Sequence, residues 1–446
     1  MSFVGLTREE EQRMLREIGV ERFEELLGEV PEEVRLSEPP PIPGPLSEIE
    51  LRRMLGGWAE ENHARGAASF LGGGIYEHWI PAAVDTLAGR AEFLTAYTPY
   101  QPEVAQGTLT AIFEFQSMIA ELTGCDVANA SMYDGATATA EAALLARRQT
   151  GRRRVVVAGM LHPHTLAVLR TYLDPAEVTA VEGTDGLAPL AALQDALGSD
   201  AACLVYQQPN FFGLVEPAAA LHEAAHAAGA LAIAVCDPVA LALLEPPGRT
   251  GADLVVGEAQ SLGSPMSFGG PLLGYFAARR SLLRALPGRL VAETVDRDGK
   301  RGFVLTLQTR EQHIRREKAT SNICTNQGLI ALRATIHMGL LGREGMREVA
   351  ELCVQKSHHA ARLAAAVPGY RLAHAAPFVR EFVLDCPVPA RRVIEAGVGM
   401  GVRPGINLGR FRPEWKDRLL VAVTELRSAE EIDRWAETLR RAGGAR

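Results

Sequence analysis

Between residues 126 and 276 the chain alternates between short apolar runs of strand length and segments with helical spacing. The strand candidates are Asp126–Ala130, Arg154–Ala158, Ala202–Tyr206, Leu231–Cys236, Leu254–Val256 and Leu272–Phe276. Helices are expected from about Ala136, His164 and Arg279, and over Glu216–Ala228. Apolar strands separated by helices are typical of a mostly parallel sheet with helices on both faces. We therefore predict a large α/β domain over residues 66–320.

The segments on either side of this domain have a different texture. Residues 1–65 predict a helical arm, in which Thr7 with Glu10 and Ser47 with Glu50 form capping-box patterns. A proline-rich stretch over 39–45 separates the two predicted helices and favours extended backbone. The arm has too little apolar surface to fold alone, so we expect it to pack on the main domain or on another subunit.

After residue 320 the pattern predicts a smaller α+β domain over 321–446. Two helices are followed by two strands, and the predicted ranges are Gln327–Leu340, Glu344–Ala366, Phe378–Leu384 and Leu419–Val423.

Composition excludes several classes of protein. The formal net charge is −8 and the longest basic block is Arg152–Arg154, whereas a nucleic-acid binder needs a clustered basic face. The apolar runs are far shorter than the ~20 residues of a membrane helix. The first residues lack the pattern of a signal peptide, and the six cysteines form no CxxC pair. We expect a protein of the cytoplasm that binds neither nucleic acid nor membrane, with reduced thiols.

One short motif suggests zinc. His222-Glu223-Ala224-Ala225-His226 is a literal HExxH, which places two histidines one turn apart on a helix. A third ligand is missing, because the extended pattern wants histidine at the position of Ala232. The segment also lies where a crossover helix of the α/β fold belongs, so we favour that interpretation and expect no metal.

A second constellation suggests a cofactor site. Asp134, Gly135 and Thr137 lie between a predicted strand and helix, where free backbone N–H groups would form a cup for phosphate. Asp237 lies at the carboxyl end of a predicted strand, and ligands bind at the carboxyl ends of the strands in open α/β sheets. A phosphate cup with a strand-end aspartate is the arrangement of a pyridoxal-phosphate site, in which the aspartate keeps the pyridine nitrogen protonated.

The lysine that such a site requires is missing. The strand that ends at Gly257 is followed by Glu258, Ala259 and Gln260, and a glutamine amide cannot form a Schiff base. The chain has four lysines, and they lie elsewhere, at Lys300, Lys318, Lys356 and Lys416. The chain thus has the shape of a pyridoxal-phosphate enzyme without its nucleophile.

Five motifs carry a specific resemblance: Tyr97–Glu103, Gln106-Gly107, Phe115–Gly124, Gly257–Gly263 and Arg316–Gln327. On these motifs the chain resembles glycine decarboxylase, the P-protein of the glycine cleavage system, over nearly its whole length. The match is to subunit 1 (alpha) of the two-subunit form. In that family the second subunit carries His-Lys where this chain has Ala259-Gln260. The missing lysine is therefore the family's own pattern.

The resemblance implies the fold of type I pyridoxal-phosphate transferases and a reaction shared between two chains. Subunit 2 (beta) holds pyridoxal phosphate covalently, and this chain does not. Glycine condenses with that cofactor, carbon dioxide leaves, and the aminomethyl group passes to the lipoyl arm of the H-protein. The T-protein and the L-protein complete the system.

Enzymes of this type build active sites at a dimer interface, which implies candidate residues in this chain. We expect an interface role for Tyr97, Thr98, Tyr100, Gln101, Thr325 and Asn326, and a positive rim from Arg316 and Lys318. The tyrosines would lie near the glycine adduct, and Thr325 would donate to the partner's phosphate. Interface packing, a helix cap and surface salt bridges are the structural alternatives. Asp134, Gly135, Thr137 and Asp237 are interpreted as relics of the cofactor cup.

Three other functions stay open at this stage. The first is a non-catalytic scaffold or regulatory subunit of a pyridoxal-phosphate enzyme. The second is a zinc peptidase that acts through His222 and His226. The third is a homodimeric pyridoxal-phosphate enzyme with an unorthodox lysine.

Overall fold

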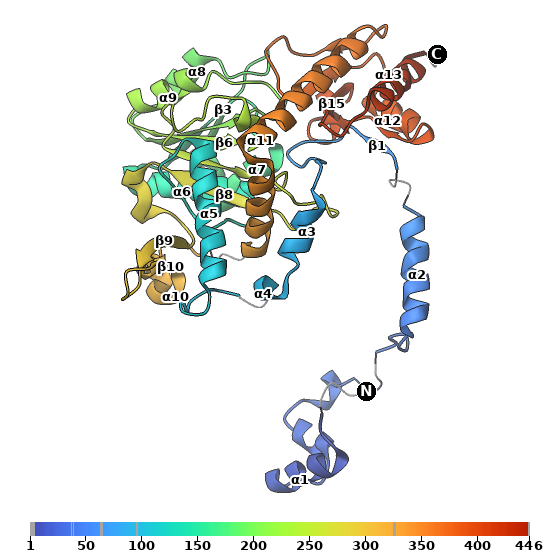
Figure 1. Ribbon diagram of the computed structural model, residues 1–446. Coiled ribbons are helices and arrows are strands. Elements are labelled where there is room, and N and C mark those ends of the chain that lie inside the picture. Colours follow the sequence, from blue (N-terminus) through green and yellow to red (C-terminus); the bar gives the residue numbers. More distant parts are fainter. Residues whose placement is uncertain are drawn as a thin grey trace. The chain divides into compact units, whose positions relative to one another are not determined.

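The computed structural model describes residues 5–36, 38, 40–62, 66–94, 97–323 and 327–444. The chain divides into two compact units, Met1–Arg65 and Gly66–Arg446 (Figure 1). Within the described ranges, each helix is too short or too polar to cross a membrane.

The first unit is helical. It contains α1 (Arg8–Ile18), two short 3₁₀ helices (Phe23–Leu27 and Glu32–Val34) and α2 (Glu48–Glu60). Both predicted capping boxes are confirmed, since Thr7 and Ser47 each accept a hydrogen bond from the N–H three residues on, and the glutamate there accepts one in return.

The first unit buries little of its own apolar surface. Among its described residues, Leu15 is the one buried hydrophobic side chain. Large hydrophobic side chains of the unit that stay exposed include Met14, Ile18, Phe23, Val34, Leu36, Ile42, Ile49 and Trp58. A unit of this kind gains little hydrophobic stabilisation by itself.

A seven-stranded sheet forms the centre of the second unit, in the order β2-β8-β7-β6-β5-β3-β4. The strands are β2 (Val127–Ala128), β3 (Arg154–Ala158), β4 (Val178–Val181), β5 (Ala201–Gln208), β6 (Leu231–Cys236), β7 (Leu254–Glu258) and β8 (Gly274–Ala278). Pairs from β4 to β7 are parallel, whereas β8 runs antiparallel to both β7 and β2. The mostly parallel α/β sheet is confirmed.

Helices cover both faces of this sheet. One face packs on α6 (Gly135–Thr150) and α7 (Pro163–Tyr172). The other face packs on α5 (Gln106–Thr123), α8 (Leu190–Ala196), α9 (Ala218–Ala227) and the first part of α11 (Gly328–Ala365). Beside the sheet lie the short helices α3 (Ala82–Ala88) and α4 (Ala91–Leu94), the antiparallel hairpin β9 (Leu290–Val295) and β10 (Arg301–Thr306), and α10 (Gln312–Arg315).

The C-terminal part contains a second, four-stranded antiparallel sheet in the order β11-β12-β15-β14. Its strands are β11 (Arg371–Leu372), β12 (Glu381–Asp385), β14 (Ile406–Asn407) and β15 (Arg418–Ala422). The later part of α11 packs there with α12 (Ala390–Gly399) and α13 (Ala429–Gly444). Another short pair, β1 (Ala68–Ser69) and β13 (Val402–Arg403), brings the start of the unit to this part of the chain.

The two helices expected over Gln327–Leu340 and Glu344–Ala366 are confirmed, because α11 is interrupted between them at Gly342, where φ is 60°. Two other local predictions differ from the structure. The helix expected from Arg279 is a 3₁₀ helix, Arg280–Ala285. The β9–β10 hairpin was not foreseen, because its sequence has little apolar alternation. Since Gly66–Arg446 packs as one unit, the division at residue 320 stays a prediction.

Candidate functional site

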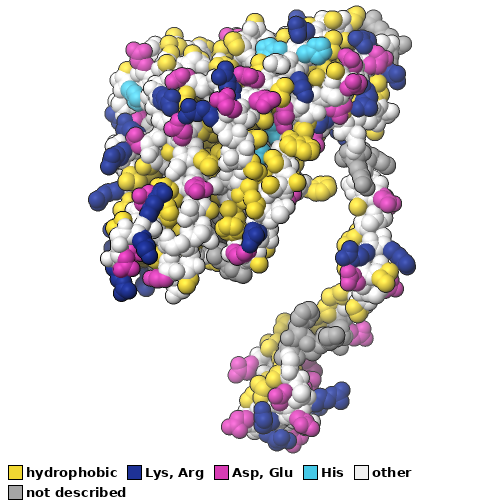
Figure 2. Space-filling view, viewed as in Figure 1, with side chains coloured by type: hydrophobic (Ala, Val, Ile, Leu, Met, Phe, Trp, Pro, Cys, Tyr) yellow, Lys and Arg dark blue, Asp and Glu magenta, His cyan; other side chains and the backbone are white. Residues whose placement is uncertain are grey.

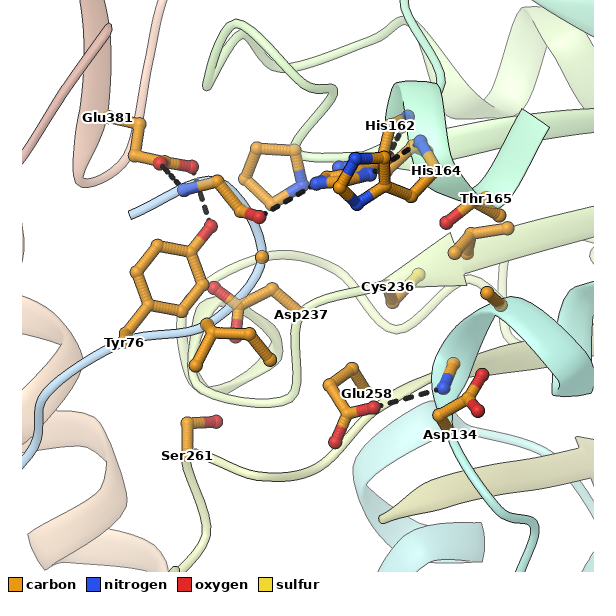
Figure 3. Close-up of a pocket in the computed structure, with 18 of the residues that line it drawn as sticks. Tyr76, Asp134, His162, His164, Thr165, Cys236, Asp237, Glu258, Ser261 and Glu381 are labelled. Carbon is orange, nitrogen blue, oxygen red and sulfur yellow. Dashed lines mark hydrogen bonds between the residues drawn. The ribbon is translucent and has the colours of Figure 1, made fainter. Parts of the chain in front are cut away.

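A cavity of about 330 Å³ lies at the carboxyl ends of the parallel strands. Its walls come from the glycine-rich loop 73–76, the first turns of α6 and α7, the ends of β5, β6 and β7, and the start of β12 (Figure 3). The carboxyl edge of an open α/β sheet is where ligands bind. Of the four cup residues predicted from sequence, three line this cavity, namely Asp134, Gly135 and Asp237. The fourth, Thr137, lies in the first turn of α6 and is not among the lining residues.

Two backbone N–H groups at the start of α6, those of Gly135 and Thr137, already have partners. Asp134 caps the helix, and its Oδ1 accepts the N–H of Thr137 at 2.8 Å. The N–H of Gly135 donates to Oε2 of Glu258 at 3.0 Å. Glu258 ends β7, and its other oxygen accepts the N–H groups of Gln260 and Leu273, each at 2.9 Å. Two of the donors expected to be free for a phosphate are therefore bonded to carboxylates of this chain.

Asp237 also has an internal partner. Its carboxylate forms an ion pair with the buried guanidinium of Arg380, and its Oδ1 accepts the N–H of Val239 at 3.0 Å. The guanidinium of Arg380 lies 3.5 Å from the centre of the Tyr76 ring and donates to Nε2 of His78 at 2.7 Å. Asp237 and Arg380 thus neutralise each other inside the cavity wall.

The ion pair continues into a buried chain of polar groups. Because Nε2 of His78 accepts from Arg380, its Nδ1 carries the proton and donates to Glu425 at 2.7 Å. Burial opposes ionisation of Glu425, but the bonds from His78 and from the Trp79 N–H hold its pKa at about 2. Glu425 is therefore an anion at neutral pH.

Gln260, at the position where a Schiff-base lysine would stand, fixes the glycine-rich loop. Its side chain is buried, and its Oε1 accepts the N–H of Tyr76 at 3.1 Å. Its Nε2 donates to the carbonyls of Tyr76 at 3.1 Å and Ser264 at 2.6 Å. Three backbone groups depend on this one amide.

The same loop is held from its other side by Glu381. The carboxylate of Glu381 accepts the Gly73 N–H at 2.7 Å and the Tyr76 hydroxyl at 2.5 Å. Burial raises the pKa of Glu381, although these two bonds act against that shift. His162 donates to the Gly73 carbonyl at 2.8 Å, and burial lowers its pKa to about 4.

The HExxH histidines are bonded to protein groups. The motif lies on α9, the crossover helix between β5 and β6, as predicted. Nδ1 of buried His222 donates to the Thr250 carbonyl at 2.8 Å, and its Nε2 accepts the Tyr206 hydroxyl at 2.8 Å. His226 pairs with Asp253 at 3.0 Å.

Among the described residues, one group of side chains has the types and spacing of a metal site. The ligand atoms of His78, Cys353 and Glu425 lie within 4.8 Å of one another. Binding through Nδ1 of His78 would put the proton on Nε2, which faces the donor of Arg380. Burial also raises the pKa of the Cys353 thiol to about 12, while a metal requires the thiolate. These groups do not fit a metal ion.

The tyrosine segment predicted to reach a partner lies apart from this cavity and is partly exposed. The side chains of Tyr97 and Tyr100 are 70% and 50% exposed. Tyr97 and Pro99 line a second cavity of about 220 Å³, beside α5 and the start of α11. The rings of Tyr100 and His313 pack edge to face, with their centroids 5.9 Å apart. Thr98 is half-buried and Gln101 is exposed.

The structure says less about the other interface candidates. Arg316 and Lys318 are exposed on a 3₁₀ helix, consistent with either a rim or a surface role. Thr325 and Asn326 lie outside the described residues.

Sequence reasoning gave no role to three groups that shape the cavity: Glu258, Arg380 and Glu381. Glu258 carried a signal, since it is an acidic residue at the end of a buried strand, two positions before Gln260. Arg380 and Glu381 carried no such signal. They reach the cavity from the start of β12, more than 100 residues after Leu272, the preceding lining residue in the sequence.

The chain is similar to known proteins over almost its full length. The family model of the glycine cleavage system P-protein matches residues 1–439. Proteins named probable glycine dehydrogenase (decarboxylating) subunit 1 from Chlorobaculum parvum and Moorella thermoacetica are each 51% identical, over 98% and 99% of this chain and 99% of their own length.

Solved structures give the same result. A crystal structure of glycine decarboxylase (P-protein) of the glycine cleavage system, in inhibitor-bound form, has 45% identity and a TM-score of 0.90, covering 99% of this chain and all of that one. A sphingosine-1-phosphate lyase from Burkholderia pseudomallei has 18% identity and a TM-score of 0.64, covering 92% of this chain and 93% of its own, and shows a shared fold. The fold is that of type I pyridoxal-phosphate-dependent enzymes. The chain belongs to the glycine cleavage system P-protein family.

Proposed function

We propose that this chain is subunit 1 (alpha) of a two-chain glycine dehydrogenase (decarboxylating), an enzyme that is active only with its beta subunit. Together the two chains decarboxylate glycine, release carbon dioxide and transfer the aminomethyl group to the lipoyl arm of the H-protein. The observation that carries the proposal is the match, over 98% of the chain, to proteins named as this subunit. The T-protein and L-protein are the further partners that the family implies.

The fold implies pyridoxal phosphate, but the residues of this chain do not fit it. Gln260 offers no amine for a Schiff base, and its amide is bonded to Tyr76 and Ser264. Asp237 is paired with Arg380, and the Gly135 N–H is bonded to Glu258. We therefore assign the cofactor to the beta subunit.

Unsatisfied apolar surface supports an obligate partner. The first unit leaves most of its large hydrophobic side chains uncovered by its own residues. On the second unit, Tyr97, Tyr100, Val104 and Leu329 are exposed near α5 and the start of α11, and Figure 2 shows hydrophobic side chains gathered on the face that these helices occupy. Exposed apolar patches of this kind mark interaction surfaces.

A scaffold or regulatory role is the second candidate. It is favoured by the internal bonding of the cavity, because the carboxylates of Asp237, Glu258 and Glu381 are all bonded within the chain. The two candidates differ in whether this chain contributes to the rate beyond assembly.

Glycine–bicarbonate exchange tests the proposal. We expect labelled bicarbonate to enter the glycine carboxyl when this chain, the beta subunit and lipoylated H-protein are mixed. Each chain alone should give no exchange. Exchange by the beta subunit alone at the full rate, or no exchange by the mixture, would contradict the assignment.

The tyrosine segment separates a catalytic from a scaffold contribution. Tyr97→Phe and Tyr100→Phe each remove one hydroxyl, and Pro99 restrains the segment between them, so its geometry is retained. If a hydroxyl stabilises the transition state, the loss lowers single-turnover decarboxylation by the complex about 10²–10³-fold without changing assembly or cofactor content.

Tyr172→Phe is the matched control, since Tyr172 is a half-exposed tyrosine at the end of α7. If Tyr97→Phe and Tyr100→Phe both keep a rate within about twofold of wild type, and so lack the loss of about 10²–10³-fold expected for a catalytic hydroxyl, the scaffold role is favoured.

Gln260 is expected to matter for stability. Gln260→Ala strands the Tyr76 N–H and two buried carbonyls, which costs about 1–3 kcal/mol. Thermal denaturation should show a midpoint several degrees lower, whereas Gln312→Ala, at an exposed glutamine, should leave it unchanged. An unchanged midpoint for Gln260→Ala would show that the glycine-rich loop is held by its other contacts.

A further inference from the structure

The start of α6 has the features that bind phosphate in other proteins. A sixteen-residue helix presents backbone N–H groups and the positive end of its dipole to the cavity. In this chain a carboxylate occupies that position. Figure 3 shows Glu258 beside Asp134, with its bond to the first turn of the helix.

Glu258 accepts three backbone N–H bonds, from Gly135, Gln260 and Leu273, at 2.9–3.0 Å. The donors come from three separate points of the chain and converge on one carboxyl group. An inorganic anion at the same place would use the same donors. Glu258 is thus bonded as a bound oxyanion would be.

The first turn of α6 lies directly against the end of β7. A Cβ added to Gly135 would lie 2.8 Å from the Glu258 backbone nitrogen. The Glu258 side chain lines the cavity and bonds to that first turn, so a phosphate that used the same N–H donors would have to displace it.

The charge of the cavity also opposes an anion. Its lining includes four acidic side chains, Asp134, Asp237, Glu258 and Glu381, and Arg380 is the one Lys or Arg among the described lining residues. Arg380 is already paired with Asp237. His162 is neutral, since burial lowers its pKa to about 4.

We propose that Glu258 is the residue that excludes phosphate-bearing ligands, pyridoxal phosphate included, from this chain's cavity, by occupying the three donors that would hold the phosphate. The inference deepens the proposed function, in which the beta subunit carries the cofactor. It explains why cofactor binding is confined to one chain without relying on the missing lysine alone.

Removal of the carboxylate should convert the position into an anion site. In Glu258→Ala the N–H groups of Gly135, Gln260 and Leu273 lose their acceptor and face a space freed by the side chain. We expect equilibrium dialysis of the full chain to show saturable binding of labelled inorganic phosphate at least about tenfold tighter than in wild type. Pyridoxal phosphate, tested in parallel, should gain by a similar factor, because the phosphate is the shared group.

Two further variants make the test specific. Glu258→Ser also removes the carboxylate while leaving a small polar side chain, and it should bind phosphate even if the alanine variant folds poorly. Glu216→Ala is the matched control: Glu216 is another buried carboxylate whose pKa burial raises to about 7, as for Glu258, and it does not line the cavity.

Four results would overturn the inference. The first three are saturable phosphate binding by wild type as tight as in the variants, no gain in either Glu258 variant, and an equal gain in Glu216→Ala. The fourth is a gain for pyridoxal phosphate without one for inorganic phosphate, since the ring would then be the group recognised. The readout is independent of glycine exchange, so either proposal can fail without the other.

Discussion

The ion pair between Asp237 and Arg380 joins the seven-stranded and the four-stranded sheet of the second unit. Asp237 follows β6 in the large sheet, and Arg380 directly precedes β12 in the small one. Both side chains lie in a mostly buried setting, where loss of one partner typically costs about 3–5 kcal/mol because the other charge is left alone. His78 and Glu425 extend the pair, so the charge of Arg380 is compensated on two sides. The side chains of Asp237 and Arg380 also line the cavity, so the contact links the sheets at its wall.

The glycine-rich loop depends on the same region. Gln260 holds Tyr76 from the β7 side, Glu381 holds Gly73 and Tyr76 from the β12 side, and the Arg380 guanidinium packs on the Tyr76 ring. Each of these groups is of a kind that enzymes use on ligands, and here each is bonded to protein. A pocket of the pyridoxal-phosphate type is thereby retained as architecture while its polar groups stabilise the fold.

Much of the large domain could be predicted from sequence, because strand and helix periodicity are local properties. The predicted strands Arg154–Ala158 and Leu231–Cys236 agree with β3 and β6 to the residue, and both capping boxes form. The absence of a lysine after β7 was equally readable, since it needs only the position of one strand.

The internal partners of the cavity were not predictable in this way. The contact of Glu258 with Gly135 joins residues 123 apart, and that of Arg380 with Asp237 joins residues 143 apart. Such pairs depend on how the sheets pack, which no local pattern encodes. The sequence therefore placed Asp134 and Gly135 at the start of a helix but gave no indication that the Gly135 N–H is bonded to Glu258.

Reduction with borohydride tests most directly the central claim that this chain has the fold of a pyridoxal-phosphate enzyme but leaves the cofactor to its partner. The assembled two-chain complex would be reduced, digested and mapped for pyridoxyl-lysine. The account predicts label in the beta subunit alone. Label at Lys300, Lys318, Lys356 or Lys416 of this chain would contradict it.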